Sequence, residues 1–309
     1  MKLLRKCPIC NHQSRQLSSW GGYGYHVFDR MAGIQVDWAK EPYTLSKCLN
    51  CSYIFKTSRL SEAELLDIYS KFTERTSGCP GTTNVSERLK NLASFSEEVA
   101  LMHSFGRRVL DIGCSNGAML QLWGPDWIKS GIEPSTTSAD EANQRGIDIV
   151  ASSINLLESG LWDCIISVDT IEHINDPMAF FASVKNFLTP GGVVITLSGD
   201  MSYGLASLAG PRYWYSSFPE HVGFLLPSTY SYIAKKLNGR IVFSRRYSWR
   251  APGCFNALRF FLQLIKYMAL FLVISVSRLF GLNTPIAKRP FPVMDSHFDH
   301  LVTVMGRFD

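Results

Sequence analysis

Short apolar runs alternate with helix-like stretches through the middle of the chain. Five such runs, at 107–112, 128–132, 147–150, 162–168 and 193–197, each have the length of a buried strand. The stretches 137–145 and 177–188 predict helices between them, and the second helix is expected to end at Pro190-Gly191-Gly192. Because strand and helix alternate, we predict an α/β domain built on a parallel sheet.

Two further helices are predicted before this domain. Ser61 can cap a helix over 61–75, whose first turn carries Glu62 and Glu64. Apolar residues recur every three or four positions between 86 and 104 and predict a second helix there. We expect both helices to link the N-terminal residues to the α/β domain.

An apolar segment, 251–295, separates two more predicted strands at 239–248 and 300–307. Its most apolar part is 255–281, but the longest uncharged run within it has 11 residues, short of the roughly 20 that span a bilayer. Both ends must return to one sheet, which excludes a single crossing. We expect an interfacial helix or a shallow re-entrant hairpin on a membrane, with a dimer interface or a substrate lid as alternatives. The basic residues that could face anionic lipid are Arg245, Arg246, Arg250, Lys288 and Arg289.

Composition indicates a folded, mostly soluble protein of about two domains, with 309 residues, 46% of them hydrophobic and 18% charged. The net charge of +5 is unevenly distributed: +5 over 1–56, −7 over 57–239 and +7 over 240–309. The basic ends suit nucleic acid, anionic lipid or a phosphorylated substrate equally well. No signal-peptide pattern follows Met1, so a cytoplasmic location is expected, with peripheral contact on the inner face of the membrane left open.

Two Cys-x-x-Cys pairs, Cys7/Cys10 and Cys48/Cys51, supply the four soft ligands of a closed tetrahedral zinc site. A closed site has no open coordination position, so its role would be structural. We therefore predict a zinc-ribbon domain over 1–56, with a β-rich insertion between the pairs. His12 could replace one of the cysteines as a ligand, and two unrelated cysteine pairs are the alternative.

The first strand of the α/β domain leads into a glycine turn, Gly113 to Gly117, and then a helix. Backbone N–H groups at such a turn can approach a nucleotide-type ligand closely. Glu133 ends the second strand about 20 residues later, where a carboxylate can accept hydrogen bonds from ribose hydroxyls.

These motifs resemble those of the class I S-adenosylmethionine-dependent methyltransferases: VLDIGCSNG, GIEPS, DCIISVDTIEHINDP and FLTPGG occur in the family's order. The resemblance implies a Rossmann-like, seven-stranded sheet closed by an antiparallel pair. It also implies that Glu133 binds the ribose, that Asp169 and Thr170 close over the cofactor, and that Ser153 and Ile154 lie near the adenine, where the family often has an acidic residue. The methionine end would be held by Asp111 and the backbone around Gly113, Cys114, Ser115 and Gly117.

A zinc ribbon before such a domain also resembles the sugar C-methyltransferases and their relatives in glycan biosynthesis. That group carries a Glu-His pair after the fifth strand, which here is Glu220-His221. A histidine near neutral pKa suits proton removal, and the neighbouring carboxylate can orient it, so the pair is the predicted catalytic site. Phe218 replaces the group's tyrosine, and Glu172-His173 is a second, more structural candidate pair.

The resulting hypothesis is a methyltransferase acting on an oxygen or carbon of a sugar, glycan precursor or lipid-linked small molecule. Its domains are 1–56, a helical linker or lid over 57–105, and 106–309 with the insertion 251–295. S-adenosyl-L-methionine and structural Zn²⁺ are the expected cofactors. Nucleic acid is not the expected partner, whereas membrane contact through 255–281 and a homodimer are left open. The alternatives are a ribosomal RNA methyltransferase whose ribbon grips RNA, and a non-catalytic, membrane-associated protein that binds the cofactor.

Overall fold

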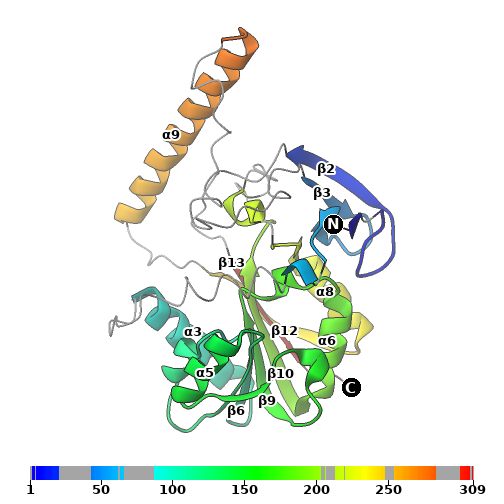
Figure 1. Cartoon of the computed structure of the whole chain (residues 1–309), viewed down its shortest axis with the longest axis vertical. Helices are drawn as coiled ribbons and strands as arrows, with labels where there is room; N and C mark the ends of the chain where they lie inside the picture. Colours follow the sequence, from blue (N-terminus) through cyan, green and yellow to red (C-terminus); the bar gives the residue numbers. More distant parts are fainter. Residues whose placement is uncertain are drawn as a thin grey trace.

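A seven-stranded sheet dominates the molecule, with the strand order β12-β13-β10-β9-β6-β7-β8 (Figure 1). The computed structural model describes residues 2–3, 5–20, 43–61, 63–65, 87–202, 206, 213–218, 220–247, 254–282, 300–306 and 308. The strands are β6 (Arg108–Ile112), β7 (Ile128–Ile132), β8 (Asp148–Ala151), β9 (Trp162–Val168), β10 (Leu188–Gly199), β12 (Arg240–Tyr247) and β13 (His300–Gly306).

The central strands β10, β9, β6, β7 and β8 are parallel, and β13 runs antiparallel between β10 and β12. The predicted parallel sheet with a closing antiparallel strand is thus confirmed. Two strands, β7 and β9, have the predicted bounds, and the others begin or end within a few residues of them.

Both faces of the sheet are buried, which explains why its strands are nearly continuous apolar runs. Leu110 and Ile165 pack on one face, against α6 (Pro177–Asn186) and α8 (Pro227–Lys236). Their neighbours Val109 and Ile166 point to the other face. That face is covered by α3 (Glu87–His103), α4 (Ala118–Gln121) and α5 (Thr136–Gln144). The helix predicted over 86–104 is therefore α3, and it packs directly into the core of the α/β domain.

One predicted boundary is wrong. Helix α6 ends at Asn186, and Pro190-Gly191-Gly192 lies inside β10 instead of stopping the helix. Leu188 already pairs with Trp162 of β9, and the register shifts before Val193. Gly191 has a φ of 79°, so the glycine provides an irregularity in the strand.

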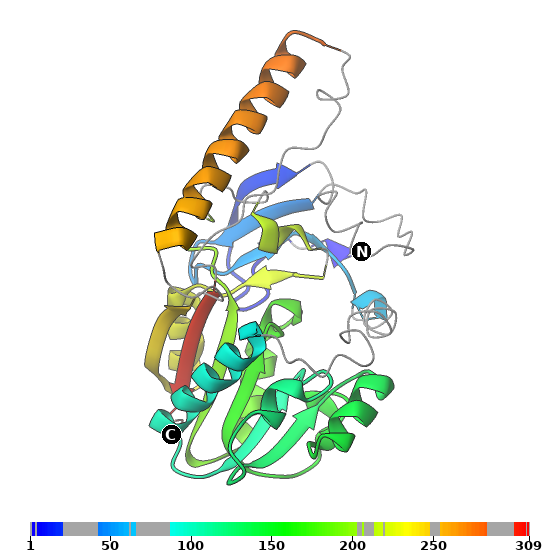
Figure 2. The same ribbon diagram turned by 90° about the vertical axis from the view of Figure 1, so that its left-hand side faces the viewer.

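The N-terminal residues form a second, four-stranded sheet, which lies beyond the ends of the large sheet's strands in both ribbon views (Figures 1 and 2). Its order is β11-β4-β3-β2, from β2 (Ser14–Trp20), β3 (Tyr43–Cys48), β4 (Ile54–Lys56) and β11 (Gly223–Phe224). A small pair, β1 (Lys2–Leu3) and β5 (Ser58–Arg59), adjoins it. Strand β11 comes from the second half of the chain, so this sheet is built from two distant segments.

The helix expected at 61–75 is seen only at its start. Ser61 and Glu64 form a capping box, in which the Glu64 carboxylate accepts from the Ser61 N–H at 2.7 Å and the Ser61 hydroxyl accepts from the Glu64 N–H at 3.3 Å. The rest of this helix, the insertion at 21–42 and the loop up to residue 86 lie outside the described residues.

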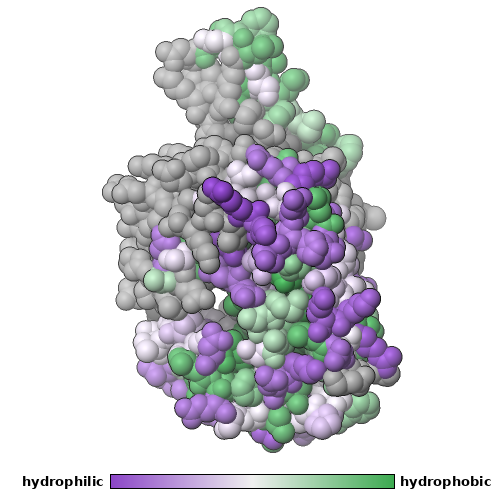
Figure 3. Space-filling view, turned by 90° about the vertical axis from the view of Figure 1, so that its right-hand side faces the viewer, coloured by the Kyte–Doolittle hydropathy of each residue, from purple (hydrophilic) through white to green (hydrophobic). Residues whose placement is uncertain are grey.

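The apolar insertion contains one long helix, α9 (Cys254–Leu279), which projects from the body of the molecule (Figure 2). Hydrophobic atoms gather on this projection, whereas hydrophilic atoms are spread over the body (Figure 3). Large apolar side chains such as Leu262, Met268 and Leu272 are more than half exposed. Among the helices that the structure describes, none combines the length and the hydropathy needed to cross a membrane.

Candidate functional site

The glycine turn after β6 has the backbone conformation that its sequence requires. Gly113 and Gly117 have φ values of 82° and 72°. A side chain at Gly113 would meet the Thr170 hydroxyl at 2.4 Å, and one at Gly117 would meet Ile147 at 2.7 Å. Both positions therefore need glycine, and Thr170 lies against the turn.

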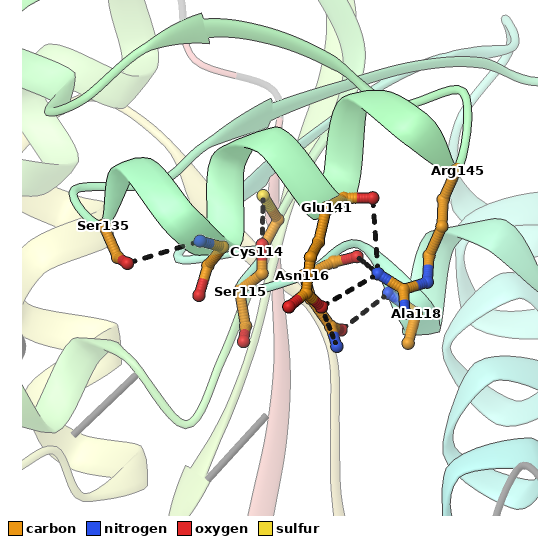
Figure 4. A network of polar contacts seen from close by, with 8 residues as sticks. Cys114, Ser115, Asn116, Ala118, Ser135, Glu141 and Arg145 are labelled. Carbon is orange, nitrogen blue, oxygen red and sulfur yellow. Dashed lines mark hydrogen bonds and ion pairs between the residues drawn. The ribbon is translucent and has the colours of Figure 1, made fainter. Parts of the chain in front are cut away.

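A polar network fastens this turn to α5 (Figure 4). The Arg145 guanidinium donates to the backbone oxygen of Asn116 at 2.9 Å and forms an ion pair with Glu141 at 3.3 Å. The Asn116 side chain donates to Glu141 at 3.2 Å and accepts from the Ala118 N–H at 3.3 Å. These contacts hold the residues between the two glycines in one conformation.

Glu133 lies directly beside the turn. One carboxylate oxygen accepts from the Ser115 N–H and the other from the Ser135 N–H, both at 2.9 Å. Burial raises the pKa of Glu133, and the two hydrogen bonds oppose that shift. Each oxygen retains a lone pair, so the carboxylate can still accept from a ligand.

Asp111 is buried near the end of β6, and its Oδ1 atom has no hydrogen-bond partner among the described residues. Burial, and then the charge of Glu133, raise the pKa of Asp111 to about 7. A buried carboxylate without a partner is unfavourable unless a cationic or hydrogen-bonding group comes to it. This orphaned oxygen beside the glycine turn fits a positively charged ligand group, such as the amino group of the methionine end of the expected cofactor.

The remaining predicted cofactor residues lie in the turns that follow β6, β8 and β9. Ser153 caps a short 3₁₀ helix, η2 (Ile154–Leu156), and Ile154 is buried. Cys114 is buried, and burial raises the pKa of its thiol. Asp169 has a φ of 47°, an unusual value that turns the chain sharply after β9.

The partly exposed Asp169 contacts a cluster of buried polar residues, Glu172, Tyr215 and His300. The Tyr215 hydroxyl lies 2.9 Å from Asp169 and also contacts Glu172, while His300 Nε2 lies 3.1 Å from Asp169. Ser198 donates to Glu172 at 2.8 Å. Burial, followed by the charge of Asp169, raises the pKa of Glu172 to about 8. No local motif marks Tyr215 or His300, because they come from η5 (Trp214–Ser217) and β13.

The predicted catalytic pair, Glu220-His221, adjoins this cluster. His221 Nδ1 lies 2.6 Å from the backbone oxygen of Tyr215, and its ring meets that of His173 edge to face at 4.7 Å. Burial lowers the pKa of His221 well below its usual value and that of His173 to about 4. Both imidazoles are thus neutral at pH 7, and the near-neutral pKa expected of a catalytic histidine is wrong for His221, because burial makes it a weaker base. Glu220 is buried, and its Oε2 atom has no hydrogen-bond partner among the described residues.

The four predicted cysteine ligands do come together. The Cys7–Cys51, Cys10–Cys48 and Cys10–Cys51 sulfur pairs are separated by 3.5, 3.3 and 3.7 Å. A disulfide would need about 2.05 Å, whereas four sulfurs around a tetrahedral zinc ion at about 2.3 Å stand about 3.8 Å apart. The His12 ring is exposed, contacts the Cys10 carbonyl oxygen and is not part of this group of ligand atoms.

The two cysteine turns also match each other in shape. The residue after each pair, Asn11 and Ser52, has a positive φ, of 57° and 64°. The N–H groups of Asn50 and Cys51 point to the Cys48 sulfur, each at 3.4 Å. Backbone donors around a thiolate are the kind of outer contact that metal ligands receive.

Comparison with known proteins gives consistent similarities. Residues 82–242, about half of the chain, match the protein family described as "Methyltransferase domain". A ubiquinone biosynthesis O-methyltransferase of Paraburkholderia xenovorans is 25% identical over 154 residues, covering 45% of this chain and 66% of the relative. Its counterpart in Burkholderia multivorans is 26% identical over 142 residues, covering 41% and 61%. The chain thus spans less than two thirds of the length of these curated relatives.

Among solved structures, N-methyltransferase NodS from Bradyrhizobium japonicum WM9, in complex with S-adenosyl-l-homocysteine, is similar with a TM-score of 0.48 and 13% identity. That similarity covers 78% of this chain and 98% of that chain.

Proposed function

Because the chain belongs to the methyltransferase domain family, as its motifs predict, we propose that it transfers a methyl group from S-adenosyl-L-methionine to a small-molecule acceptor. The cofactor supplies the methyl group on a positively charged sulfur. Asp111 and the backbone of the glycine turn would hold its methionine end, and Glu133 its ribose. The observation that carries this assignment is the buried Asp111 oxygen, which has no partner among the described residues and lies beside a turn that requires glycine twice.

We propose His221 as the general base. Its Nδ1 atom lies against a backbone oxygen, which favours a proton on Nδ1 and leaves Nε2 as the basic nitrogen. A neutral imidazole can take a proton from an acceptor hydroxyl or an activated carbon as the methyl group is transferred. Glu220 would support the imidazolium that forms.

The acceptor class follows from two observations. The curated relatives are named for O-methyl transfer in ubiquinone biosynthesis, which supports an oxygen on an apolar or lipid-linked molecule. The exposed apolar side chains of α9 support the same class, because a helix of this kind can lie in a membrane interface with its apolar face buried. The proposal of a sugar or glycan acceptor is supported by the four-cysteine ribbon and the Glu220-His221 loop.

A structural zinc ion held by the four cysteines is part of the proposal. The support is the near-tetrahedral spacing of the sulfurs and the paired turns that carry them. With all four positions taken by protein, the ion would stabilise the N-terminal sheet and take no part in methyl transfer.

The test is a transfer assay with labelled S-adenosylmethionine against lipid extract, nucleotide-sugars and ribosomal RNA. Labelled product in the lipid or sugar fraction is expected. Glu133→Ala is the control, because it leaves the proposed base intact but should abolish labelling at low cofactor concentration. Labelling of RNA alone would overturn the acceptor class, and no labelling of any fraction by protein that binds the cofactor would overturn the enzymatic proposal.

A further inference from the structure

Lys56 is a buried lysine that no sequence motif marks. It ends β4 in the N-terminal sheet and is 0% exposed. Its ammonium group donates a hydrogen bond to the backbone oxygen of Phe218, which lies 162 positions away in the loop that carries Glu220 and His221. Buried lysines are rare because removing the charge from water is costly, so this placement needs a reason.

The same residue fastens the other end of that loop through its backbone. The Lys56 N–H donates to the Val222 oxygen at 3.0 Å, and β4 then pairs with β11 through Phe55 and Gly223. The segment 218–222 is therefore attached to the cysteine-bearing sheet on both sides of the Glu220-His221 pair. The loop is also held from the large-sheet side, where the Val222 N–H donates to the backbone oxygen of Glu172 at 2.8 Å.

The charges around the loop give Lys56 a second role. The described titratable groups that face Glu220 and His221 are Lys56 from β4, Asp169 after β9, Glu172 and His173 from η3 (Ile171–His173), Tyr215 from η5 and His300 from β13. Burial raises the pKa of Glu220 to about 7, and the charge of Lys56 opposes this shift. Burial lowers the pKa of Lys56 to about 7, and the charge of Glu220 opposes that one. The charge of each group therefore favours the ionised form of the other.

We propose that Lys56 is a positioning residue of the methyl-transfer site: it holds the Glu220-His221 loop through the Phe218 carbonyl and places a buried positive charge beside that loop. This inference rests on the function proposed above. The N-terminal sheet then supports the active site, since a residue of that sheet holds the loop that carries the proposed base pair.

The coupling can be measured without knowing the acceptor. In protein labelled with ¹³C at the glutamate carboxyls, the Glu220 signal is assigned by its loss in Glu220→Gln. Lys56→Met should raise the pKa of Glu220 by about one unit, because it removes the positive charge that opposes the effect of burial. Lys47→Met, on the neighbouring strand β3, is the matched control and should leave the Glu220 titration unchanged.

A reciprocal measurement covers the case in which Lys56→Met does not fold. Glu220→Gln should lower the pKa of the Lys56 ammonium by a similar amount, read from labelled lysine side chains. If neither group responds to the loss of the other, the inference is overturned.

Turnover separates this inference from the proposed function. With an acceptor in hand, Lys56→Met should lower kcat about tenfold while cofactor affinity and zinc content stay within twofold of the parent. Equal turnover in parent and variant would refute the positioning role even if the protein is a methyltransferase. Coupled titrations without turnover on any acceptor would instead refute the proposed function and leave the Lys56–Glu220 pair intact.

Discussion

Asp111→Asn tests the cofactor site most directly, because it removes a charge and changes little else. In the native protein the pKa of Asp111 is raised from an ordinary 3.8 to about 7, chiefly by burial. The native state therefore binds more protons than the unfolded state between about pH 4 and pH 7. The Asp111 contribution to stability falls as the pH rises through this window. Above pH 7 the folded protein bears the full free-energy cost of burying the ionised carboxylate.

A shift of about three pH units corresponds to about 4 kcal/mol of stability lost at pH 8. Asparagine avoids the charge but still buries an amide, so Asp111→Asn should stabilise the cofactor-free protein by about 1 to 3 kcal/mol at pH 8 and by almost nothing at pH 4. Denaturant unfolding at the two pH values measures this difference. Asp148→Asn, at an exposed position that begins β8, is the control and should change neither value appreciably.

Cofactor binding should depend on pH in the opposite direction: affinity should rise with pH, whereas the Asp111 contribution to stability falls. If a cationic group of the cofactor needs the Asp111 carboxylate, the parent protein should bind S-adenosylmethionine about tenfold more weakly at pH 6 than at pH 8, because only about one molecule in ten is ionised at the lower pH. Asp111→Asn should bind weakly at both. Calorimetric affinities that do not vary with pH in the parent, or a variant no more stable than the parent at pH 8, would refute the assignment of an unpartnered buried carboxylate to the cofactor.

Three further outcomes are expected. Purified protein should contain one zinc per chain, and Cys48→Ser should lose the metal and be less stable than the parent; a metal-free parent would contradict the zinc site. His221→Ala should lower turnover by roughly 10² to 10⁴ with cofactor affinity nearly unchanged, whereas His103→Ala should not, and a loss below fivefold would place the base elsewhere. Leu272→Asp should weaken sedimentation with vesicles containing anionic lipid, while Leu156→Asp, equally exposed on the body, should not; equal binding by both would mean that α9 serves another surface.

The sequence predicted the elements whose signal lies within a few neighbouring residues. Strands such as β7 and β9 are short, continuous apolar runs, and the glycine turn between β6 and α4 follows from backbone rules that operate over a few residues. The meeting of the two cysteine pairs was also predictable, because metal chemistry favours one arrangement of four thiols. The zinc itself and the catalytic pair remain predictions.

What the sequence could not predict depends on contacts between distant segments. Tyr215, His300 and Lys56 reach the site from three separate elements. Tyr215 at least shares the loop of the predicted Glu220-His221 pair, whereas nothing near His300 or Lys56 in sequence marks a functional role. Strand β11 has only two residues, too few for any periodic pattern, and its partner β4 is far away. The end of α6 was misplaced because glycines that commonly stop helices serve here as an irregularity inside β10.

The pairing of β4 with β11 has a consequence for how the chain is made. Phe55 lies opposite Gly223, so the edge of the N-terminal sheet stays incomplete until the ribosome has synthesised most of the α/β domain. During that interval Lys56 has neither the Phe218 carbonyl nor Glu220 beside it and remains in water as an ordinary lysine. Contacts this distant in sequence form late and slowly. The nascent N-terminal sheet thus has three of its four strands, and the step that adds β11 and buries Lys56 also brings the Glu220-His221 loop into place.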